Sequence, residues 1–235
     1  MEPPRQTVRR YPVAAARGSF ATLDDESFDH QMTIRAILWD ADGVVQSPDV
    51  ERRAAWQALL GNGRDVDAFL GAVFEAERPA WVGRSDFTNA LASLLGTWQC
   101  VGTLEDAIAA WTMIRPDSDV MGVVRGLRDR GLQCHLASNQ ESLRAHHMST
   151  VLNYRHTFDR EFYSCRMGVA KPSAAYFRAI VQALDLSPES LLFLDDKEVN
   201  VGAARAEGFH AARFVLDSGA PHLVRILAGF RVDVV

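Results

Sequence analysis

Residues 34–45 read IRAILWDADGVV, an apolar run that ends abruptly in two carboxylates and a glycine. Within this run, residues 37–39 show no polar alternation, which is typical of a central parallel strand covered on both faces. Parallel sheets bind their ligands at the carboxyl ends of their strands, and Asp40 and Asp42 stand at that end. An aspartate followed by a glycine is also common at ordinary turns. The stretch by itself therefore predicts a buried strand and leaves its chemistry open.

The composition is that of an ordinary globular protein. With 235 residues and 48% hydrophobic content, the chain is long enough for one or two domains. Its net charge of −5 provides no basic footprint for nucleic acid. No apolar run approaches the roughly 18 residues that a membrane span requires, so we expect no membrane partner. The three cysteines form no C-x-x-C pair and no apolar signal region precedes the first strand, which predicts reduced thiols in a cytoplasmic protein.

Two segments differ in character from the rest of the chain. Residues 1–31 show no sustained periodicity and are predicted to be a flexible N-terminal extension, without which a chain beginning at Met32 folds and works. Residues 50–115 combine apolar residues at helical spacings with few strand signals, and they contain four of the five tryptophans. They are predicted to form a small helical insert between two core segments, residues 32–49 and 116–235. The tryptophans are expected to fill the insert's own core or to form an aromatic wall over a substrate.

Beyond the insert, apolar runs alternate with amphipathic stretches. Strands are predicted at residues 132–137, 162–163, 191–194 and 211–216. Helices are predicted between them, because their apolar residues recur at helical spacing. Strands that alternate with helices form a parallel sheet with right-handed crossovers. The predicted fold class is therefore α/β, a doubly wound parallel sheet with a small helical insert after the first strand.

Polar residues follow three of the predicted strands where each strand ends. The pairs are Asp40 with Asp42, Ser138 with Asn139, and Asp195 with Asp196. Because the carboxyl ends of parallel strands meet at one edge of a sheet, we expect these pairs to converge on a single crevice.

Lysine is rare in this chain, with only Lys171 and Lys197 among 25 basic residues. A sequence so rich in arginine is expected to carry arginine wherever the two are equivalent, so Lys171 suggests a need for a compact ammonium. Lys171 also precedes Pro172, which is expected to open a helix, and would then lie at a helix N-terminus that favours anions. Lys197 is interpreted as a solvated charge.

Four segments resemble, in this order, the motifs of the haloacid dehalogenase-like (HAD) hydrolase superfamily: DADGVV at 40–45, Ser138-Asn139, Lys171-Pro172, and FLDD at 193–196 with Asn200. The resemblance covers about residues 34–217. Over residues 164–208 the chain is most similar to sugar-phosphate phosphatases and to the phosphatase domain of soluble epoxide hydrolases. The resemblance implies a Rossmann-like core with strand order 5-4-1-2-3, and it makes the helical insert a cap. Ser85, in a Gly-x-Ser segment similar to theirs, is expected to begin a cap helix.

The same resemblance implies Mg²⁺-dependent phosphate chemistry. Mg²⁺ takes oxygen ligands at near-octahedral geometry, and here they would be the Asp40 carboxylate, the Asp42 backbone carbonyl and Asp196. Asp195 would be a second acidic neighbour, and which of the two last aspartates binds the metal directly is left open. Asp40 would form an aspartyl-phosphate, and Asp42 would act as acid and base.

The remaining motif residues would surround the phosphoryl group. Ser138, Asn139, nearby backbone amides and Lys171 would hold its oxygens. Asn200 is expected to tie the loop of the fourth motif. We therefore predict a phosphatase of a small phosphorylated, sugar-phosphate-like metabolite.

Other activities of the superfamily are weighed against this prediction. Asp42 argues against a 2-haloacid dehalogenase, because halide leaves without a proton and those enzymes lack an aspartate there. The phosphonatase branch needs a cap lysine, and residues 50–115 contain none. A non-catalytic HAD-like binding protein would be expected to have lost a catalytic carboxylate. A phosphomutase shares all the core motifs and stays open as the alternative.

Overall fold

The computed structural model describes residues 33–234, so the predicted extension at residues 1–31 lies outside the described part. Its centre is a parallel sheet in the order β5-β4-β1-β6-β7. The strands are β1 (Ala36–Trp39), β4 (Gln133–Ser138), β5 (Arg160–Tyr163), β6 (Leu191–Asp195) and β7 (His210–Arg213). Counted along the chain within this sheet and read from β7, the order is 5-4-1-2-3. The predicted fold class is confirmed.

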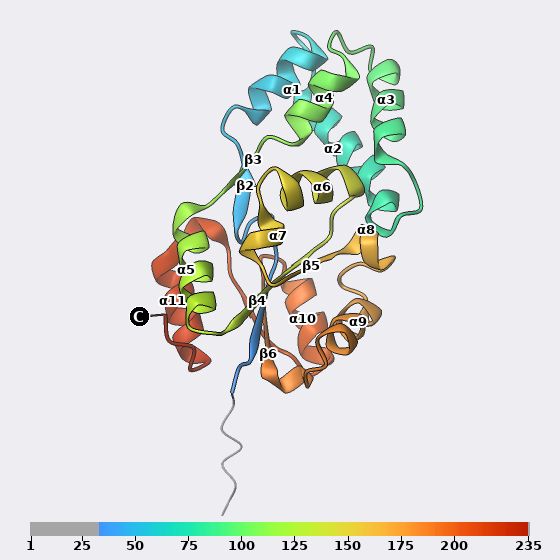
Figure 1. Cartoon of the computed structure of the whole chain (residues 1–235). Coiled ribbons are helices and arrows are strands. Elements are labelled where there is room, and N and C mark those ends of the chain that lie inside the picture. Colours follow the sequence, from blue (N-terminus) through green and yellow to red (C-terminus); the bar gives the residue numbers. More distant parts are fainter. Residues whose placement is uncertain (1–32, 235) are drawn as a thin grey trace, which may run out of the picture. The chain divides into compact units, whose positions relative to one another are not determined.

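Helices cover both faces of the sheet (Figure 1). The helices of the core are α5 (Ser118–Asp129), α6 (Ser142–Thr150), α7 (Tyr154–Thr157), α8 (Ser164–Met167), α9 (Ala174–Leu184), α10 (Glu198–Ala206) and α11 (Ala220–Gly229). Ile37 and Trp39 pack into the apolar cluster that contains residues of α5 and α11, whereas Ala36 and Leu38 pack into the cluster of α9 and α10. All four residues are fully buried, because successive strand residues point to opposite faces and both are covered.

The insert lies between two short strands, β2 (Gln46–Pro48) and β3 (Ile114–Pro116), which pair antiparallel. It consists of α1 (Arg52–Leu60), α2 (Val66–Glu77), the 3₁₀ helix η1 (Arg78–Val82), α3 (Phe87–Thr97) and α4 (Leu104–Trp111). Trp56 and Trp111 are fully buried in the insert's own apolar core, and Trp98 packs against it. Trp81 lines a cavity instead. The role in the insert's own core is therefore confirmed, and an aromatic wall over a substrate stays a prediction for Trp81.

Besides shifts of one or two residues at other strand ends, three element boundaries differ from the sequence prediction. The last strand ends at Arg213, because its partner β6 ends at Asp195 and the chain then runs on to the 3₁₀ helix η3 (Leu216–Ser218). Helix α9 does not open at Pro172 but at Ala174, after the Ser173 side chain accepts a hydrogen bond from the Ala175 amide. Lys171 is therefore outside the first turn of this helix.

The third difference concerns the cap helix α3. Asp86, rather than Ser85, precedes it, and the Asp86 carboxylate accepts a hydrogen bond from the Asn89 amide. Serine and aspartate are both good N-caps, so the residue types alone could not decide which of these two neighbours begins the helix. A further 3₁₀ helix, η2 (Pro188–Ser190), precedes β6.

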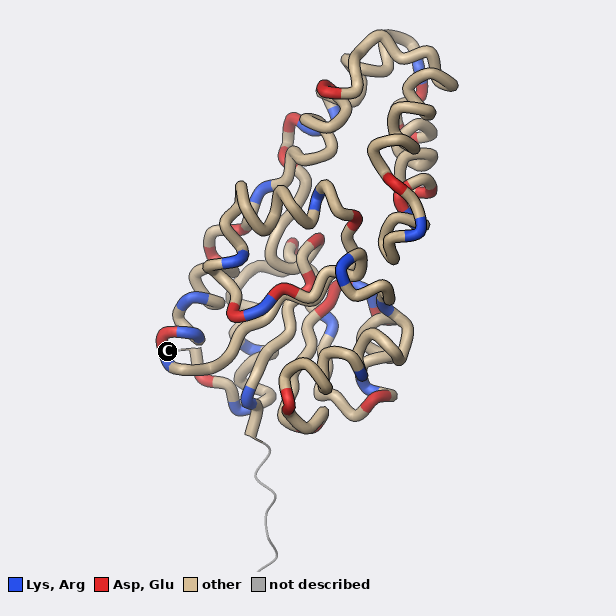
Figure 2. The backbone as a smooth tube through the Cα atoms, turned by 45° about the vertical axis from the view of Figure 1, so that its right-hand side comes forward, with Lys and Arg blue, Asp and Glu red and all other residues tan. Residues whose placement is uncertain are grey.

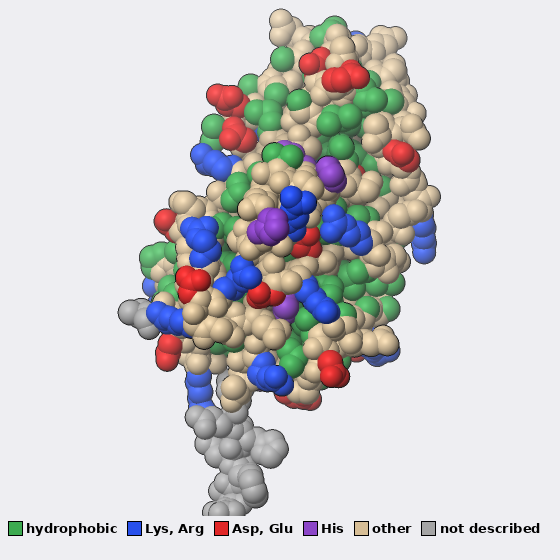
Figure 3. All heavy atoms as spheres, in the orientation of Figure 1, with side chains coloured by type: hydrophobic (Ala, Val, Ile, Leu, Met, Phe, Trp, Pro, Cys, Tyr) green, Lys and Arg blue, Asp and Glu red, His purple; other side chains and the backbone are tan. Residues whose placement is uncertain are grey.

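Charges of both signs are interspersed along core and cap in the view of Figure 2. The face shown in Figure 3 likewise mixes basic, acidic and apolar side chains. Among residues 33–234, no helix is both long enough and apolar enough to cross a membrane.

Candidate active site

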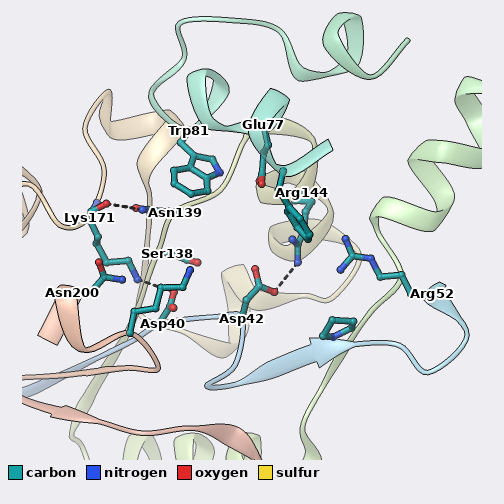
Figure 4. A pocket seen from close by; sticks show the side chains of 13 residues that line it. Asp40, Asp42, Arg52, Glu77, Trp81, Ser138, Asn139, Arg144, Lys171 and Asn200 are labelled. Carbon is teal, nitrogen blue, oxygen red and sulfur yellow. Dashed lines mark hydrogen bonds and ion pairs between the residues drawn. The ribbon is translucent and has the colours of Figure 1, made fainter. Parts of the chain in front are cut away.

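The three polar pairs meet at the carboxyl edge of the sheet, as Figure 4 shows for their members that line the cavity. Asp40 follows β1, Ser138 ends β4 and Asp195 ends β6. Asp40 and Ser138 border a cavity of about 210 Å³ between this edge and the cap. Its lining residues are Asp40, Asp42, Pro48, Arg52, Phe74, Glu77, Trp81, Ser138, Asn139, Arg144, Lys171, Lys197 and Asn200.

Lys171 lies between two of the carboxylates. Its ammonium is 2.8 Å from Asp40 Oδ1 and 2.7 Å from Asp195 Oδ2, and it also donates to the Ala137 carbonyl at 2.8 Å. Burial acts to lower the pKa of Lys171, but Asp40 and Asp195 outweigh it and the net shift is upward. Burial raises the pKa of Asp40, Lys171 opposes this, and Asp195 adds to the rise. One ammonium therefore leaves the negative charge at this edge only partly compensated.

Three carboxylates here could hold a cation. Asp40, Asp195 and Asp196 each offer an oxygen, and these oxygens lie within 4.8 Å of one another. The Asp196 Oδ1 atom is buried and has no hydrogen-bond partner among the described residues. Burial, followed by the neighbouring Asp195, raises the pKa of Asp196. An all-oxygen donor set with surplus negative charge and an unpartnered buried oxygen fits Mg²⁺.

The two adjacent aspartates are used differently by their neighbours. Both Asp195 oxygens are engaged: Oδ2 accepts from Lys171, and Oδ1 accepts from the Lys197 amide at 2.8 Å. The Asn200 side chain donates to both oxygens, at 3.0 and 3.1 Å, and so ties this loop as the sequence predicted. The Asp196 carboxylate, in contrast, keeps one buried oxygen without a hydrogen-bond partner among the described residues. These contacts favour Asp196 over Asp195 as the residue that would bind the metal directly.

Asp42 is held by three side chains that the sequence analysis did not single out. Its Oδ1 accepts from Arg144 at 2.7 Å and from Gln46 at 2.8 Å, and its Oδ2 accepts from Gln140 at 2.8 Å. Burial acts to raise the pKa of Asp42, but Arg144 and the two amides outweigh it and the net shift is downward. Asp42 is therefore favoured as a carboxylate before a substrate binds.

The predicted phosphate-binding residues lie at the cavity, but not all are free. Ser138 lines it, and its hydroxyl accepts from Gln140 at 3.3 Å. The Asn139 side chain exchanges two hydrogen bonds of 2.9 Å with the backbone of Lys171. Asn139 therefore positions the lysine loop, and its contact with phosphate stays a prediction. Lys197 is exposed, as its interpretation as a solvated charge requires.

The cap contributes two charged side chains that the sequence analysis missed, and one of its tryptophans. Arg52 from α1 and Glu77 from the end of α2 are 7% and 4% exposed, and Trp81 from η1 stands beside them. Burial raises the pKa of Glu77 to about 7. Charged residues on amphipathic helices normally face solvent, so no pattern in the sequence indicated that these two would be enclosed.

The sequence profile of the haloacid dehalogenase-like hydrolases matches residues 34–208. The chain belongs to this family of hydrolases. Among curated proteins, the HAD hydrolase is similar to a sesquiterpene phosphatase, astK, of Aspergillus oryzae, with 28% identity over 95 residues that make up 40% of this chain and 48% of the relative. It is also similar to acyl-CoA dehydrogenase family member 10 of Mus musculus, with 31% identity over 104 residues, 44% of this chain and 10% of the relative. The matches span about half or less of these relatives.

Solved structures share the fold of this HAD hydrolase. A HAD-like family hydrolase from Porphyromonas gingivalis aligns with a TM-score of 0.68 and 22% identity over 83% of this chain and 98% of its own. A HAD family enzyme from Bacteroides thetaiotaomicron, in complex with magnesium and inorganic phosphate, aligns with a TM-score of 0.65 and 19% identity over 81% and 98%. An L-2-haloacid dehalogenase from Xanthobacter autotrophicus gives 0.60 and 23% over 83% of each chain.

Proposed function

We propose that this HAD hydrolase is a Mg²⁺-dependent phosphatase of a small phosphorylated metabolite. The observation that carries the proposal is the pair of carboxylates at the cavity: Asp40 against the Lys171 ammonium, and Asp42 two residues on. A dehalogenase has no use for the second carboxylate, whereas a phosphatase needs it to move a proton. The likeness to a sesquiterpene phosphatase supports the same reaction class. The magnesium and phosphate in the Bacteroides enzyme support the same cofactor.

Asp40 and Asp42 would carry out the hydrolysis of the phosphate ester in two steps. Asp40 attacks the phosphorus atom and forms an aspartyl-phosphate while the bond from phosphorus to the alcohol oxygen breaks. The alcohol oxygen takes a proton from Asp42, which Asp42 has first accepted from the phosphate ester bound as its monoanion. Water then attacks the aspartyl-phosphate and gives its proton to Asp42, so that inorganic phosphate leaves and both carboxyl groups are restored. Arg144 favours the carboxylate form of Asp42, which suits the base of the second step.

Positive groups make this attack possible. Lys171 and Ser138 hold the transferring oxygens, and the Asn139 side chain fixes the lysine loop through its two hydrogen bonds. A Mg²⁺ held by Asp40, the Asp42 carbonyl and Asp196 would offset the negative charge that a phosphate ester brings to a carboxylate nucleophile.

A panel of phosphate esters tests the proposal, with release of inorganic phosphate as the measurement. We expect turnover with Mg²⁺, its loss on adding EDTA, and its return with excess Mg²⁺. Asp40→Asn should lower turnover to about one part in 10³ or less, since an amide is a poor nucleophile. Release of halide from a 2-haloacid without phosphate from any ester would overturn the proposal. Transfer of phosphate between hydroxyls without free phosphate would identify a phosphomutase instead.

A further inference from the structure

Arg52 is a buried charge without a partner. Its side chain lines the active-site cavity although the residue is only 7% exposed. Its Nε and one terminal nitrogen are buried without a hydrogen bond to any described residue, and no carboxylate of residues 33–234 lies within 4.0 Å of it. Burying an unpaired guanidinium costs free energy, so such a side chain is typical of a site that awaits an anion.

A second guanidinium lies on the same aromatic ring. The Arg52 and Arg144 guanidinium carbons are 4.9 and 5.1 Å from the centre of the Trp111 ring. Arg144 is 4% exposed, and its Nε is also buried without a partner. Figure 4 shows both side chains reaching the cavity, Arg52 from the cap and Arg144 from the core. Trp111 is thus a positioning residue for both cations.

The nearby carboxylates Asp42 and Glu77 leave Arg52 without an ion pair. One terminal nitrogen of Arg144 donates to the Asp42 carboxylate, and the Nε of Arg144 has no hydrogen-bond partner among the described residues. Burial raises the pKa of Glu77 to about 7, so at neutral pH its charge is only partly developed. Burial, and then the charge of Arg144, lowers the pKa of Arg52 to about 10, which still leaves it protonated. Arg52 therefore keeps a buried positive charge that no described carboxylate pairs with directly.

We propose that Arg52 and Arg144 bind a second anionic group of the substrate. The metabolite would carry a carboxylate or a further phosphate besides the phosphoryl group that Asp40 attacks. The planar guanidinium matches both kinds of anion with paired donors. A cavity of about 210 Å³ encloses both the arginines and Asp40, so one small molecule can reach both ends. This inference rests on the proposed phosphatase function.

Arg53, the next residue of helix α1, is a surface arginine with which Arg52 can be compared. Arg53 and its partner Asp67 are 61% and 71% exposed in their side chains, and they form an ion pair with two hydrogen bonds. Arg52, one residue earlier, is 7% exposed and forms no ion pair with a described carboxylate. Arg53 is therefore a matched control in sequence and chemistry.

Two matched substrate pairs test the proposal. Glycerol 3-phosphate and 3-phosphoglycerate differ by a hydroxymethyl group against a carboxylate, and fructose 6-phosphate and fructose 1,6-bisphosphate differ by a phosphate. We expect kcat/KM of wild-type protein with Mg²⁺ to favour the more anionic member of at least one pair by about tenfold or more. Arg52→Gln should lower this ratio about tenfold, Arg52→Lys should lower it less, and Arg53→Gln should leave it unchanged. A preference within the first pair would identify the second anionic group as a carboxylate, and a preference within the second pair would identify it as a phosphate.

Binding without turnover provides a second measurement. In Asp40→Asn protein, the ester that carries the second anionic group should raise the melting temperature more than its matched partner does, and adding Arg52→Gln should remove the difference. Equal ratios and equal melting shifts within both pairs would overturn the inference. If p-nitrophenyl phosphate and both members of each pair are hydrolysed without any preference, only this inference fails. If no ester is hydrolysed but the Arg52-dependent melting shift persists, the anion site stands and the phosphatase function fails.

Discussion

At the scale of single residues, Lys171 is a tightly constrained side chain of the site. It is 4% exposed, and its ammonium contacts two carboxylates and a carbonyl. Arginine would place a wider, planar group in this space. We therefore expect Lys171→Arg to lower kcat/KM by about 10²-fold or more, on the scale of a lost electrostatic contact to the transition state.

The control for this change is the chain's other lysine. Lys197 also lines the cavity, but it is exposed, and only its backbone amide is bonded to Asp195. Lys197→Arg should therefore change kcat/KM by only a few fold. Unaltered kinetics of Lys171→Arg, with unaltered inhibition by phosphate, would remove Lys171 from the phosphate site.

Glu77 makes stability depend on pH. Its pKa is raised from 4.5 to about 7, chiefly by burial, so the folded state binds this proton more tightly than the unfolded chain. Its contribution to the free energy of unfolding is therefore greatest below pH 4.5 and decreases as the pH rises toward 7, by about 1–3 kcal/mol in all. Glu77→Gln has no such titration. Urea unfolding should show the variant gaining stability over wild type between pH 5 and pH 8, and parallel pH profiles would contradict the assignment.

At the scale of elements, the start of α3 can be tested directly. Because the Asp86 carboxylate accepts from the Asn89 amide, Asp86→Ala should lower the free energy of unfolding by about 1 kcal/mol. Ser85→Ala should change it little, since Ser85 precedes the cap position. Urea denaturation of both variants gives the comparison. A larger loss with Ser85→Ala would mean that the helix begins one residue earlier than the structure shows.

The elements also show why part of the site was predictable. Buried parallel strands are continuous apolar runs, so residues 36–39 and 191–195 could be recognised, and the polar residues at their ends with them. Helix starts were less certain, because several nearby residues can cap equally well. Arg52 and Arg144 gave no signal, since a charged residue within a helix is ordinarily solvated. Only the packing of the cap against the core encloses them.

At the scale of the molecule, bound metal should contribute to folding stability. A ligand that binds only the folded state stabilises it by about 2.7 kcal/mol at a concentration 100 times its Kd. Mg²⁺ should therefore raise the melting temperature of the EDTA-treated protein, because the carboxyl edge of the sheet carries surplus negative charge. Asp196→Asn should abolish most of this rise.

An exposed aspartate provides the matched comparison. Asp129 ends α5 and is exposed, so Asp129→Asn should retain the full effect of Mg²⁺ on the melting temperature. An equal rise in wild type and Asp196→Asn would exclude Asp196 as a ligand.

The two arginines of the proposed anion site belong to different parts of the chain. Arg52 follows β2 in the insert, whereas Arg144 lies on the core helix α6, and the insert joins the core through β2 and β3. A substrate that binds both cations would therefore bridge the two parts by its own charge. Selectivity for the second anion would then lie mainly in how slowly the enclosed complex dissociates, rather than in how often substrate and protein meet.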